Sequence, residues 1–405
     1  MTTTTEKFGF ENQFGHRLSG RLERPSIVPT RAVALFAHCF TCTKNSRAAV
    51  RISAALASQG IATLRFDFTG LGSSEGEFAE SGFASNVSDL VSASRALEGA
   101  VGAPSVLIGH SLGGAAVIAA ADQISSVKAV VTIGAPFEVE HVLGQLGDDL
   151  AAVQKNGQAE VHIGGRPFVV DKGFVEQVYD QPQAERLKTL NKALLVMHAP
   201  HDDIVALENA SAIFQAARHP KNFISLDRAD HLLTNDRQAE NVAAMIAAWA
   251  TSYLPEFDEA EEPLPAGLVS VETAGGKFRQ LVKCGSHRIL ADEPSTIGGG
   301  DLGPTPYDLL LASLGTCTSM TIKMYADRKG IPLEQVHIEL EHSREHHDDC
   351  ATCNNAQNRI DVIDRTITLK GNLSEEDQRK LMEIADKCPV HRTLENRIDI
   401  HSTAG

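Results

Sequence analysis

The sequence predicts a doubly wound α/β domain with a mostly parallel sheet and a small cap, followed by a smaller α+β domain. Three observations predict this arrangement. Short apolar segments alternate with helix-like segments between residues 31 and 253. Residues 255–265 hold three prolines and five carboxylates, a composition typical of an exposed linker. Beyond this segment, alternating strands and two amphipathic helices replace the earlier pattern.

The first domain is expected to span residues 1–254. Its strands are short and continuously apolar, which is typical of strands buried on both faces of a parallel sheet. The predicted strands are 32–37, 62–66, 106–108, 129–133, 193–198 and 223–226. Helix-like segments between them include 47–58, 83–99 and 207–217. Residues 135–190 interrupt the alternation, and we expect them to form the cap over the site.

The second domain is expected to span residues 268–405, after a linker at 255–267. Strands are predicted around 268–291, with a turn at Gly275-Gly276. The other predicted elements are a helix at 306–329, strands at 336–340 and 366–369, and a helix at 374–387.

Composition and charge are those of an ordinary globular protein, with 42% hydrophobic and 22% charged residues. A net charge of -15, with no basic stripe to offset it, argues against nucleic acid or an anionic membrane as a partner. The sequence has no apolar run long enough to span a bilayer, and its start lacks the regions of a signal peptide. Seven cysteines in such a chain favour a cytoplasmic location with several free thiols.

Ser111 lies in the most informative motif of the chain. An apolar strand runs into Gly109-His110-Ser111-Leu112-Gly113, and an Ala-rich helix follows. A Gly-x-Ser-x-Gly turn between strand and helix exposes the serine hydroxyl, and the amide of the next residue, Leu112, points where an oxyanion would form. The alternative is a glycine-rich turn with an incidental serine, so an acid and a base must be found elsewhere.

Two later strands each end in a loop that supplies a candidate partner for Ser111. The strand at 193–198 opens into a loop with Asp202, and the strand at 223–226 opens into a loop with His231. A serine becomes a useful nucleophile when a histidine takes its proton and a carboxylate orients that histidine. Near the N-terminus, the strand at 32–37 runs into His38-Cys39-Phe40-Thr41, the place expected for the second oxyanion amide.

Residues 8–253 resemble the α/β-hydrolase superfamily. His38-Cys39-Phe40 is similar to its His-Gly-Phe turn, with Cys39 where a glycine is usual, and residues 65–74 are similar to its Arg-x-Asp-x-x-Gly-x-Gly-x-Ser segment. The resemblance implies Ser111 as nucleophile, His231 as base and Asp202 as orienting acid, with Asp203 as the alternative acid. It also implies an oxyanion hole formed by the backbone amides of Phe40 and Leu112.

Two cysteines lie on apolar helix faces of the second domain. Cys317 follows Leu310 and Leu314 at helical spacing, and Cys388 follows Leu381 and Ile384 in the same way. The two helices are therefore expected to pack together. Buried cysteines also occur simply as small hydrophobic residues.

Residues 268–405 resemble the OsmC/Ohr family, whose members often reduce organic hydroperoxides with two helix cysteines. The matching pieces are residues 303–310, 312–317 and 388–391. The resemblance implies Cys317 as the peroxidatic thiol and Cys388 as the resolving thiol. It also implies an intertwined homodimer, so dimerisation is an equally good role for this domain. Tyr307 stands where peroxidase members have a glutamate that holds an activating arginine; Arg288 is a candidate for that arginine.

A third group of residues crowds one segment that ends in Cys-x-x-Cys. Its members are His342, His346, His347, Cys350 and Cys353. A zinc site, a labile disulfide and a plain polar loop remain open here. No metal site is predicted, because a second ligand pair at standard spacing is missing and Asp348-Asp349 indicates a solvated loop.

Together these features predict a serine carboxylesterase that hydrolyses small acyl or aryl esters and needs no cofactor. Its partners are expected to be a small-molecule ester and a second copy of the chain. The alternative function is a thiol-dependent organic hydroperoxide reductase that uses Cys317 and Cys388.

Overall fold

The computed structural model describes residues 3–404 except 27, 164–165, 180, 255–262, 275 and 346–359. It divides into two compact units, Met1–Ala266 and Gly267–Gly405, each described here by itself. Most of the segment predicted as a linker, 255–262, lies outside the described residues. So do Gly275 of the predicted turn and four of the five metal candidates, His346, His347, Cys350 and Cys353.

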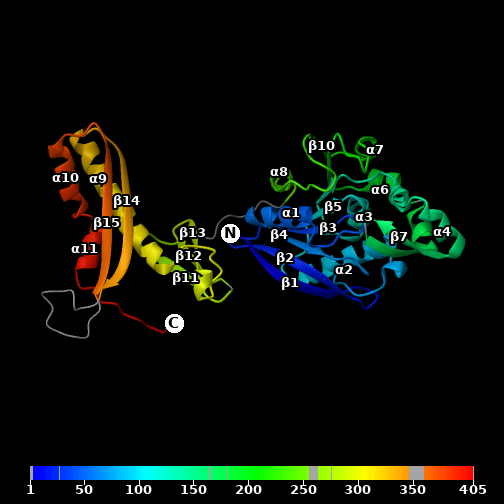
Figure 1. Cartoon of the computed structure of the whole chain (residues 1–405), viewed down its shortest axis with the longest axis horizontal. Coiled ribbons are helices and arrows are strands. Elements are labelled where there is room, and N and C mark those ends of the chain that lie inside the picture. Colours follow the sequence, from blue (N-terminus) through cyan, green and yellow to red (C-terminus); the bar gives the residue numbers. More distant parts are fainter. Residues whose placement is uncertain are drawn as a thin grey trace. The chain divides into compact units, whose positions relative to one another are not determined.

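The first unit is built on a sheet of eight described strands in the order β1-β2-β4-β3-β5-β6-β9-β10 (Figure 1). The strands from β4 to β10 run parallel to one another, and the hairpin β1–β2 joins them in antiparallel orientation. The predicted α/β fold, with its mostly parallel sheet, is confirmed. The bounds are β1 Thr3–Glu11, β2 Arg17–Pro25, β3 Ala32–Ala37, β4 Ile61–Phe66, β5 Val106–His110, β6 Ala129–Ile133, β9 Ala193–His198 and β10 Lys221–Ser225.

Two strand expectations differ from the structure. The hairpin β1–β2 was not anticipated, because its strands alternate polar and apolar residues or are largely exposed. β10 was expected to be buried on both faces, but it is the last strand of the sheet and Phe223 is 42% exposed. An edge strand has a neighbour on only one side, so an apolar segment there need not be covered.

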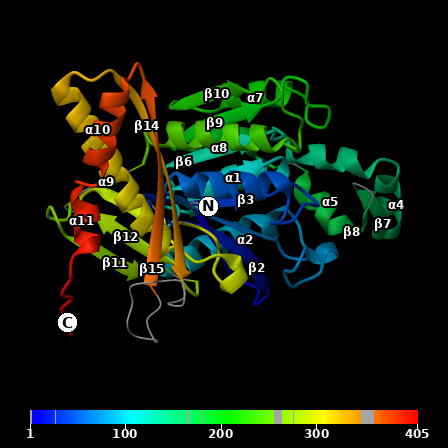
Figure 2. The same cartoon turned by 60° about the vertical axis from the view of Figure 1, so that its left-hand side comes forward.

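Helices cover both faces of this sheet (Figure 2). α1 and α8 form one apolar cluster with side chains from one face of the sheet. α2, α3 and α7 form a second cluster with side chains from the opposite face. Their bounds are α1 Arg47–Ser58, α2 Phe83–Ala100, α3 Leu112–Ala120, α7 Glu208–Ala216 and α8 Asp236–Ala250. Covering both faces explains why β3, β4, β5, β6 and β9 are buried along their whole length.

The stretch between β6 and β9 contains a small subdomain, in the region 135–190 that was expected to be a cap. Its elements are η3 Val139–Leu146, α4 Asp149–Asn156, β7 Gln158–Ile163, β8 Arg166–Asp171, α5 Lys172–Val178 and α6 Gln183–Thr189. β7 and β8 form an antiparallel hairpin. Buried side chains such as Val142 of η3 and Phe174 of α5 tie the subdomain to the α2–α3 side of the core.

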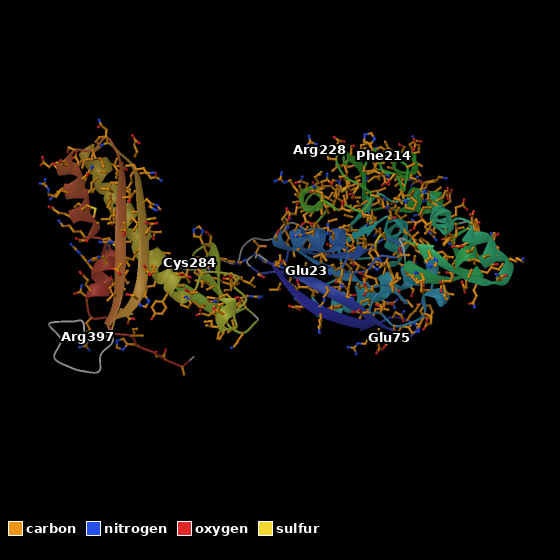
Figure 3. The ribbon with its side chains drawn as sticks, in the orientation of Figure 1. Glu23, Glu75, Phe214, Arg228, Cys284 and Arg397 are labelled. Atoms are coloured by element: carbon orange, nitrogen blue, oxygen red, sulfur yellow. A yellow bond between two sulfur atoms is a disulfide. The ribbon has the colours of Figure 1, made fainter. Side chains whose placement is uncertain are left out.

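The second unit packs helices against a long hairpin and carries a separate three-stranded sheet (Figure 1). Cys284 ends the middle strand of that sheet (Figure 3). The strands are β11 Val269–Thr273, β12 Gln280–Cys284, β13 His287–Ala291, β14 Leu333–Glu345 and β15 Ile360–Gly371, and the helices are α9 Pro306–Lys329, α10 Glu375–Ala385 and α11 Pro389–Glu395. A small apolar cluster joins α9 and α10 to the hairpin.

The helix expected at 374–387 is shorter in the structure. α10 ends at Ala385, and α11 begins with Pro389 as its first residue, where the missing N–H of proline costs nothing. Within the described residues, no helix is both long and apolar enough to cross a membrane.

Candidate active site

Ser111 lies on a sharp turn between β5 and α3. Its φ of 55° falls in the left-handed region, which is costly for a serine and is maintained by the surrounding structure. A Cβ on Gly109 would lie 2.2 Å from the carbonyl oxygen of Gly113, and a Cβ on Gly113 would lie 2.5 Å from that of His38. Only glycine at both positions lets strand and helix approach this closely, so the strained serine is held at the end of the strand.

His231 and Asp202 form the second part of the site. His231 Nδ1 lies 2.7 Å from Asp202 Oδ2, and the Asp202 side chain is fully buried. Asp202 Oδ1 accepts hydrogen bonds from the backbone N–H groups of Ile204 (2.9 Å) and Val205 (2.8 Å). Asp203, the alternative acid, is exposed. The structure therefore brings Asp202, and not Asp203, to the histidine.

The turn of Ser111 adjoins this pair through the end of β6. The Ser111 N–H donates to the carbonyl of Ile133 at 2.8 Å, and the next residue, Gly134, lies against the pair. A Cβ on Gly134 would be 3.2 Å from His231 Nδ1 and 3.3 Å from Asp202 Oδ2. The turn of Ser111 and the pair of His231 and Asp202 therefore both adjoin the carboxyl end of β6.

The electrostatics of the pair keep Asp202 ionised. Burial raises the pKa of this carboxyl, but the hydrogen bonds from His231, Val205 and Ile204 outweigh it and hold the pKa below its usual value. An ionised Asp202 holds the proton of His231 on Nδ1, which leaves Nε2 as the acceptor.

His110, the residue before the serine, is buried beside the base. Its Nε2 donates to the backbone carbonyl of His231 at 2.6 Å, and the two rings lie 5.3 Å apart. Burial, with the neighbouring His231, lowers the pKa of His110 to about 4. His110 therefore stays neutral and supports the loop that carries the base.

This lowered pKa predicts a pH-dependent loss of stability. The unfolded chain takes up a proton on His110 below about pH 6.5, whereas the folded chain does so only near about pH 4. The contribution is therefore complete above about pH 6.5 and is lost as the pH falls toward about 4, a change of about 3 kcal/mol. Urea unfolding at several pH values should show this loss in the wild type.

His110→Gln should remove that part of the slope, because an amide can still donate to the His231 carbonyl but does not titrate. His401→Gln, which changes an exposed histidine, is the control and should leave the slope as it is. A His110→Gln slope equal to that of the wild type would contradict the assignment.

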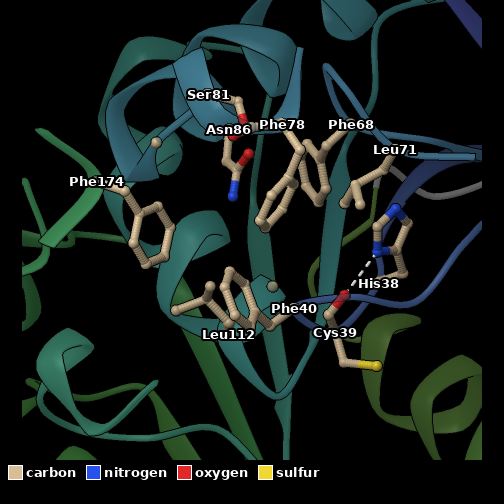
Figure 4. Close-up of a pocket in the computed structure, with 12 residues that line it drawn as sticks. His38, Cys39, Phe40, Phe68, Leu71, Phe78, Ser81, Asn86, Leu112 and Phe174 are labelled. Carbon is tan, nitrogen blue, oxygen red and sulfur yellow. Dashed lines mark hydrogen bonds between the residues drawn. The ribbon is translucent and has the colours of Figure 1, made fainter. Parts of the chain in front are cut away.

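A narrow pocket adjoins the turn (Figure 4). Phe40 and Leu112, the predicted oxyanion donors, both line it. Leu112 is the first residue of α3, so its N–H has no acceptor within the helix. The remaining lining residues are His38, Cys39, Phe68, Leu71, Phe78, Ser81, Gly82, Asn86, Gly113 and Phe174.

Comparisons with known proteins agree with this fold. Residues 34–294 match the model of the alpha/beta hydrolase family. The chain belongs to the alpha/beta hydrolase family. Residues 298–403 of this hydrolase match the model of OsmC-like proteins, so the second unit carries an OsmC-like domain. No curated protein is similar enough to the chain to count as a match.

Solved structures resemble the first unit of the hydrolase. One is the esterase domain of a Rhodothermus marinus protein, with 45% identity, a TM-score of 0.52, and coverage of 62% of this chain and 99% of that domain. Another is Est1E from Butyrivibrio proteoclasticus with ferulic acid bound, with 19% identity, a TM-score of 0.52, and coverage of 61% of this chain and 98% of that one. The second likeness shows the shared fold.

The OsmC-like domain of the hydrolase brings its two predicted thiols together. Cys317 on α9 interacts directly with Cys388, which caps the N-terminus of α11. Burial raises the pKa of the Cys317 thiol. Burial also raises that of Cys388, but the His391 N–H at 3.3 Å and other donors lower its pKa overall. Cys317 was expected to be the nucleophile, but it is the thiol whose pKa is raised, whereas the pKa of Cys388 is lowered.

Arg365 of β15 lies near these thiols, and no motif in the sequence pointed to it. Its Nη1 donates to Thr318 Oγ1 at 3.0 Å, and Thr318 Oγ1 lies 3.6 Å from Cys388 Sγ. Arg365 also pairs with Asp386 at 2.6 Å. It therefore acts on Cys388 through Thr318. Tyr307, at the position of the missing glutamate, stacks on His342 with ring centroids 4.3 Å apart.

A disulfide in the turn that carries Phe40 was not expected from the sequence. Cys39 and Cys42 are bonded to each other, while Cys284, Cys317 and Cys388 are free among the described cysteines. The signal was present in the sequence as Cys39-Phe40-Thr41-Cys42, a Cys-x-x-Cys unit directly at the predicted oxyanion donor.

Buried charges fix the chain on the C-terminal side of this disulfide. Lys44 forms a buried ion pair with Asp67, and its N–H donates to the same carboxylate at 2.6 Å. Arg65 donates to the Lys44 carbonyl at 2.6 Å and pairs with Glu23 of β2 at 2.7 Å. All four charged side chains are almost completely buried, and each is paired, as buried charges must be.

Proposed function

We propose that this alpha/beta hydrolase is a serine carboxylesterase. The observation that carries the proposal is the 2.7 Å contact between His231 and a buried Asp202, next to a serine held at φ 55°. Ser111 Oγ attacks the ester carbonyl while His231 Nε2 takes its proton. The N–H groups of Phe40 and Leu112 stabilise the oxyanion. His231 then protonates the leaving alcohol and later activates water to release the acid.

The lining of the pocket favours an ester whose acyl or aryl group is small. Four phenylalanines line it, and the Phe40 and Phe174 rings stack with centroids 5.2 Å apart. Flat or short apolar groups suit such a narrow aromatic space, because they gain contact with the ring faces without needing polar partners. A shallow groove that includes Asp203, the neighbour of Asp202 in the chain, is also lined by Glu138 and Glu140, and these carboxylates would disfavour an anionic alcohol group.

Covalent labelling tests the nucleophile directly. A p-nitrophenyl phosphonate ester should release one nitrophenol per chain and leave a phosphonyl group on the peptide that contains Ser111, as mass spectrometry would show. His231→Gln should slow this labelling strongly, because the serine then has no base. Labelling of another residue at the same rate would contradict the proposal.

The structure supports assembly as the main role of the OsmC-like domain better than it supports a peroxidase. The alternative function, hydroperoxide reduction by Cys317 and Cys388, needs a readily formed thiolate. Burial raises the pKa of Cys317, and the described contacts of Arg365 reach Cys388 rather than Cys317. We therefore propose a homodimer formed through this domain.

Exposed apolar side chains on α9 supply a surface for that dimer. Met320 is 64% and Met324 72% exposed, on the helix that holds Cys317. Light scattering after gel filtration should give twice the mass of the 43.4 kDa chain. Met324→Glu should shift the mass toward that of one chain, whereas Phe14→Glu, at another exposed apolar side chain, should not. A single-chain mass for the wild type would rule the dimer out.

A further inference from the structure

We propose that the Cys39–Cys42 pair is a redox-sensitive site, and that its oxidised form holds the oxyanion hole of the hydrolase in its working shape. The proposal rests on the proposed esterase function, because it assigns an effect on the Phe40 amide. The reductant that reacts at this site is a dithiol, either a small molecule or a protein, and it reduces the Cys39–Cys42 disulfide. Its starting observation is that the disulfide encloses the residue predicted to donate to the oxyanion.

The disulfide closes a very short ring of the chain. The cysteines are three positions apart, and the Cys42 N–H also donates to the Cys39 carbonyl at 3.2 Å. The stabilisation that a disulfide gives to a whole domain grows with the length of the loop it closes, so this bond adds little to global stability by that route. Its main effect is therefore local, on the two residues between the sulfurs.

The flanks of the turn are anchored independently of the disulfide. On one side, the His38 ring contacts the Cys39 carbonyl at 2.8 Å. On the other, Lys44 is fixed by Asp67 and Arg65. Breaking the disulfide leaves these anchors in place, so the change is confined to the short segment between them.

Phe40 transmits that change to the site. The residue is buried, and its ring packs on Phe174 at the wall of the pocket. Its N–H belongs to the peptide that follows Cys39. The carbonyl of the same peptide contacts the His38 ring and accepts from the Cys42 N–H, and without the disulfide these two contacts alone hold it. Its N–H is then held less firmly toward the position of the oxyanion. Loss of one well-placed oxyanion donor costs about 10²–10³ in kcat, and partial misplacement should cost somewhat less.

The two sulfurs differ in access, which sets the direction of the reaction. Cys39 is buried, with 7% of its surface exposed, whereas Cys42 is half-buried. A thiolate of the dithiol attacks Cys42 Sγ, the disulfide bond breaks, and Cys39 leaves as a thiolate that is then protonated. The second thiol of the reductant then attacks the reductant sulfur that is bonded to Cys42, and Cys42 is released as a thiol. Overall, two cysteine thiols form and one dithiol becomes a cyclic disulfide.

The experiment compares ester hydrolysis by the full chain in its oxidised and reduced forms. The background is Cys317→Ser/Cys388→Ser, which removes the thiol pair of the OsmC-like domain. Dithiothreitol should lower kcat for a p-nitrophenyl ester about tenfold or more, with a smaller change in KM, and reoxidation should restore it. Alkylation and mass spectrometry of the peptide with residues 39–42 report the redox state separately from activity.

Cys42→Ala is the matched variant, because it removes the bond and keeps Phe40 and Cys39. Its kcat should equal that of the reduced chain and should not respond to dithiothreitol. Three results would overturn the proposal: an unchanged kcat with the pair fully alkylated, a pair that stays reduced in an oxidising buffer, or a Cys42→Ala variant as active as the oxidised chain. These leave the esterase function intact. An oxidised chain that hydrolyses no ester and takes up no phosphonate would instead refute the proposed function itself, and the switch with it.

Discussion

Ser111→Ala is expected to lower kcat for ester hydrolysis by about 10⁶-fold. The substitution removes the only atom of the site that can form the acyl-enzyme in the proposed mechanism. The oxyanion hole and the pocket remain, so a residual acceleration of about 10³ over water is expected to survive. The measurement is the steady-state hydrolysis of a short-chain p-nitrophenyl ester, together with circular dichroism to show that the variant is folded.

Ser105→Ala is the matched control. Ser105 precedes the same strand, β5, and its hydroxyl donates to the Val33 carbonyl. Its loss should change kcat less than twofold. A folded Ser111→Ala variant that keeps more than about a hundredth of wild-type kcat would show that another group is the nucleophile.

Asp202→Asn is expected to lower kcat by about 10⁴-fold with little change in KM. An asparagine fits the same space, but its amide can donate a hydrogen bond to His231 Nδ1. The proton of the ring then moves to Nε2, and the histidine can no longer accept the proton of Ser111. The defect should be measured near neutral pH, where the low pKa of Asp202 leaves the wild-type carboxylate ionised.

Asp203→Asn supplies the comparison on the same loop. Asp203 is exposed and lies at the edge of the shallow groove, so its neutralisation should change kcat only a few-fold. If Asp203→Asn were the damaging substitution and Asp202→Asn the mild one, the acid would have been assigned to the wrong residue.

Much of the first unit could be predicted because its strands are unusual in composition. The strand at 32–37 is apolar at every position and the strand at 193–198 at every position before His198, a pattern typical of burial on both faces. The hairpin of β1 and β2 carries no such signal, because its outer strand is largely exposed. Its place in the sheet depends on pairing with β4, a contact between segments distant in sequence.

Part of the candidate site could likewise be predicted from the sequence, and part could not. Ser111, Asp202 and His231 could be proposed because each follows a recognisable strand, and the carboxyl ends of parallel strands meet at one edge of the sheet. The aromatic pocket could not be proposed, because Phe40, Phe78 and Phe174 come from three separate segments. Arg365 was missed for a similar reason, since it lies on a strand opposite the helices that carry the thiols.

The buried pair of Glu23 and Arg65 has a consequence for dissecting the protein into domains. Glu23 belongs to the N-terminal hairpin, whereas Arg65 also holds the Lys44 carbonyl beside the turn of Phe40. Trimming the chain to start after Pro25 would leave the Arg65 guanidinium without its Glu23 partner in an apolar interior, where an uncompensated charge is costly. Residues 3–25 therefore belong to the minimal catalytic piece, although none of them touches the substrate pocket.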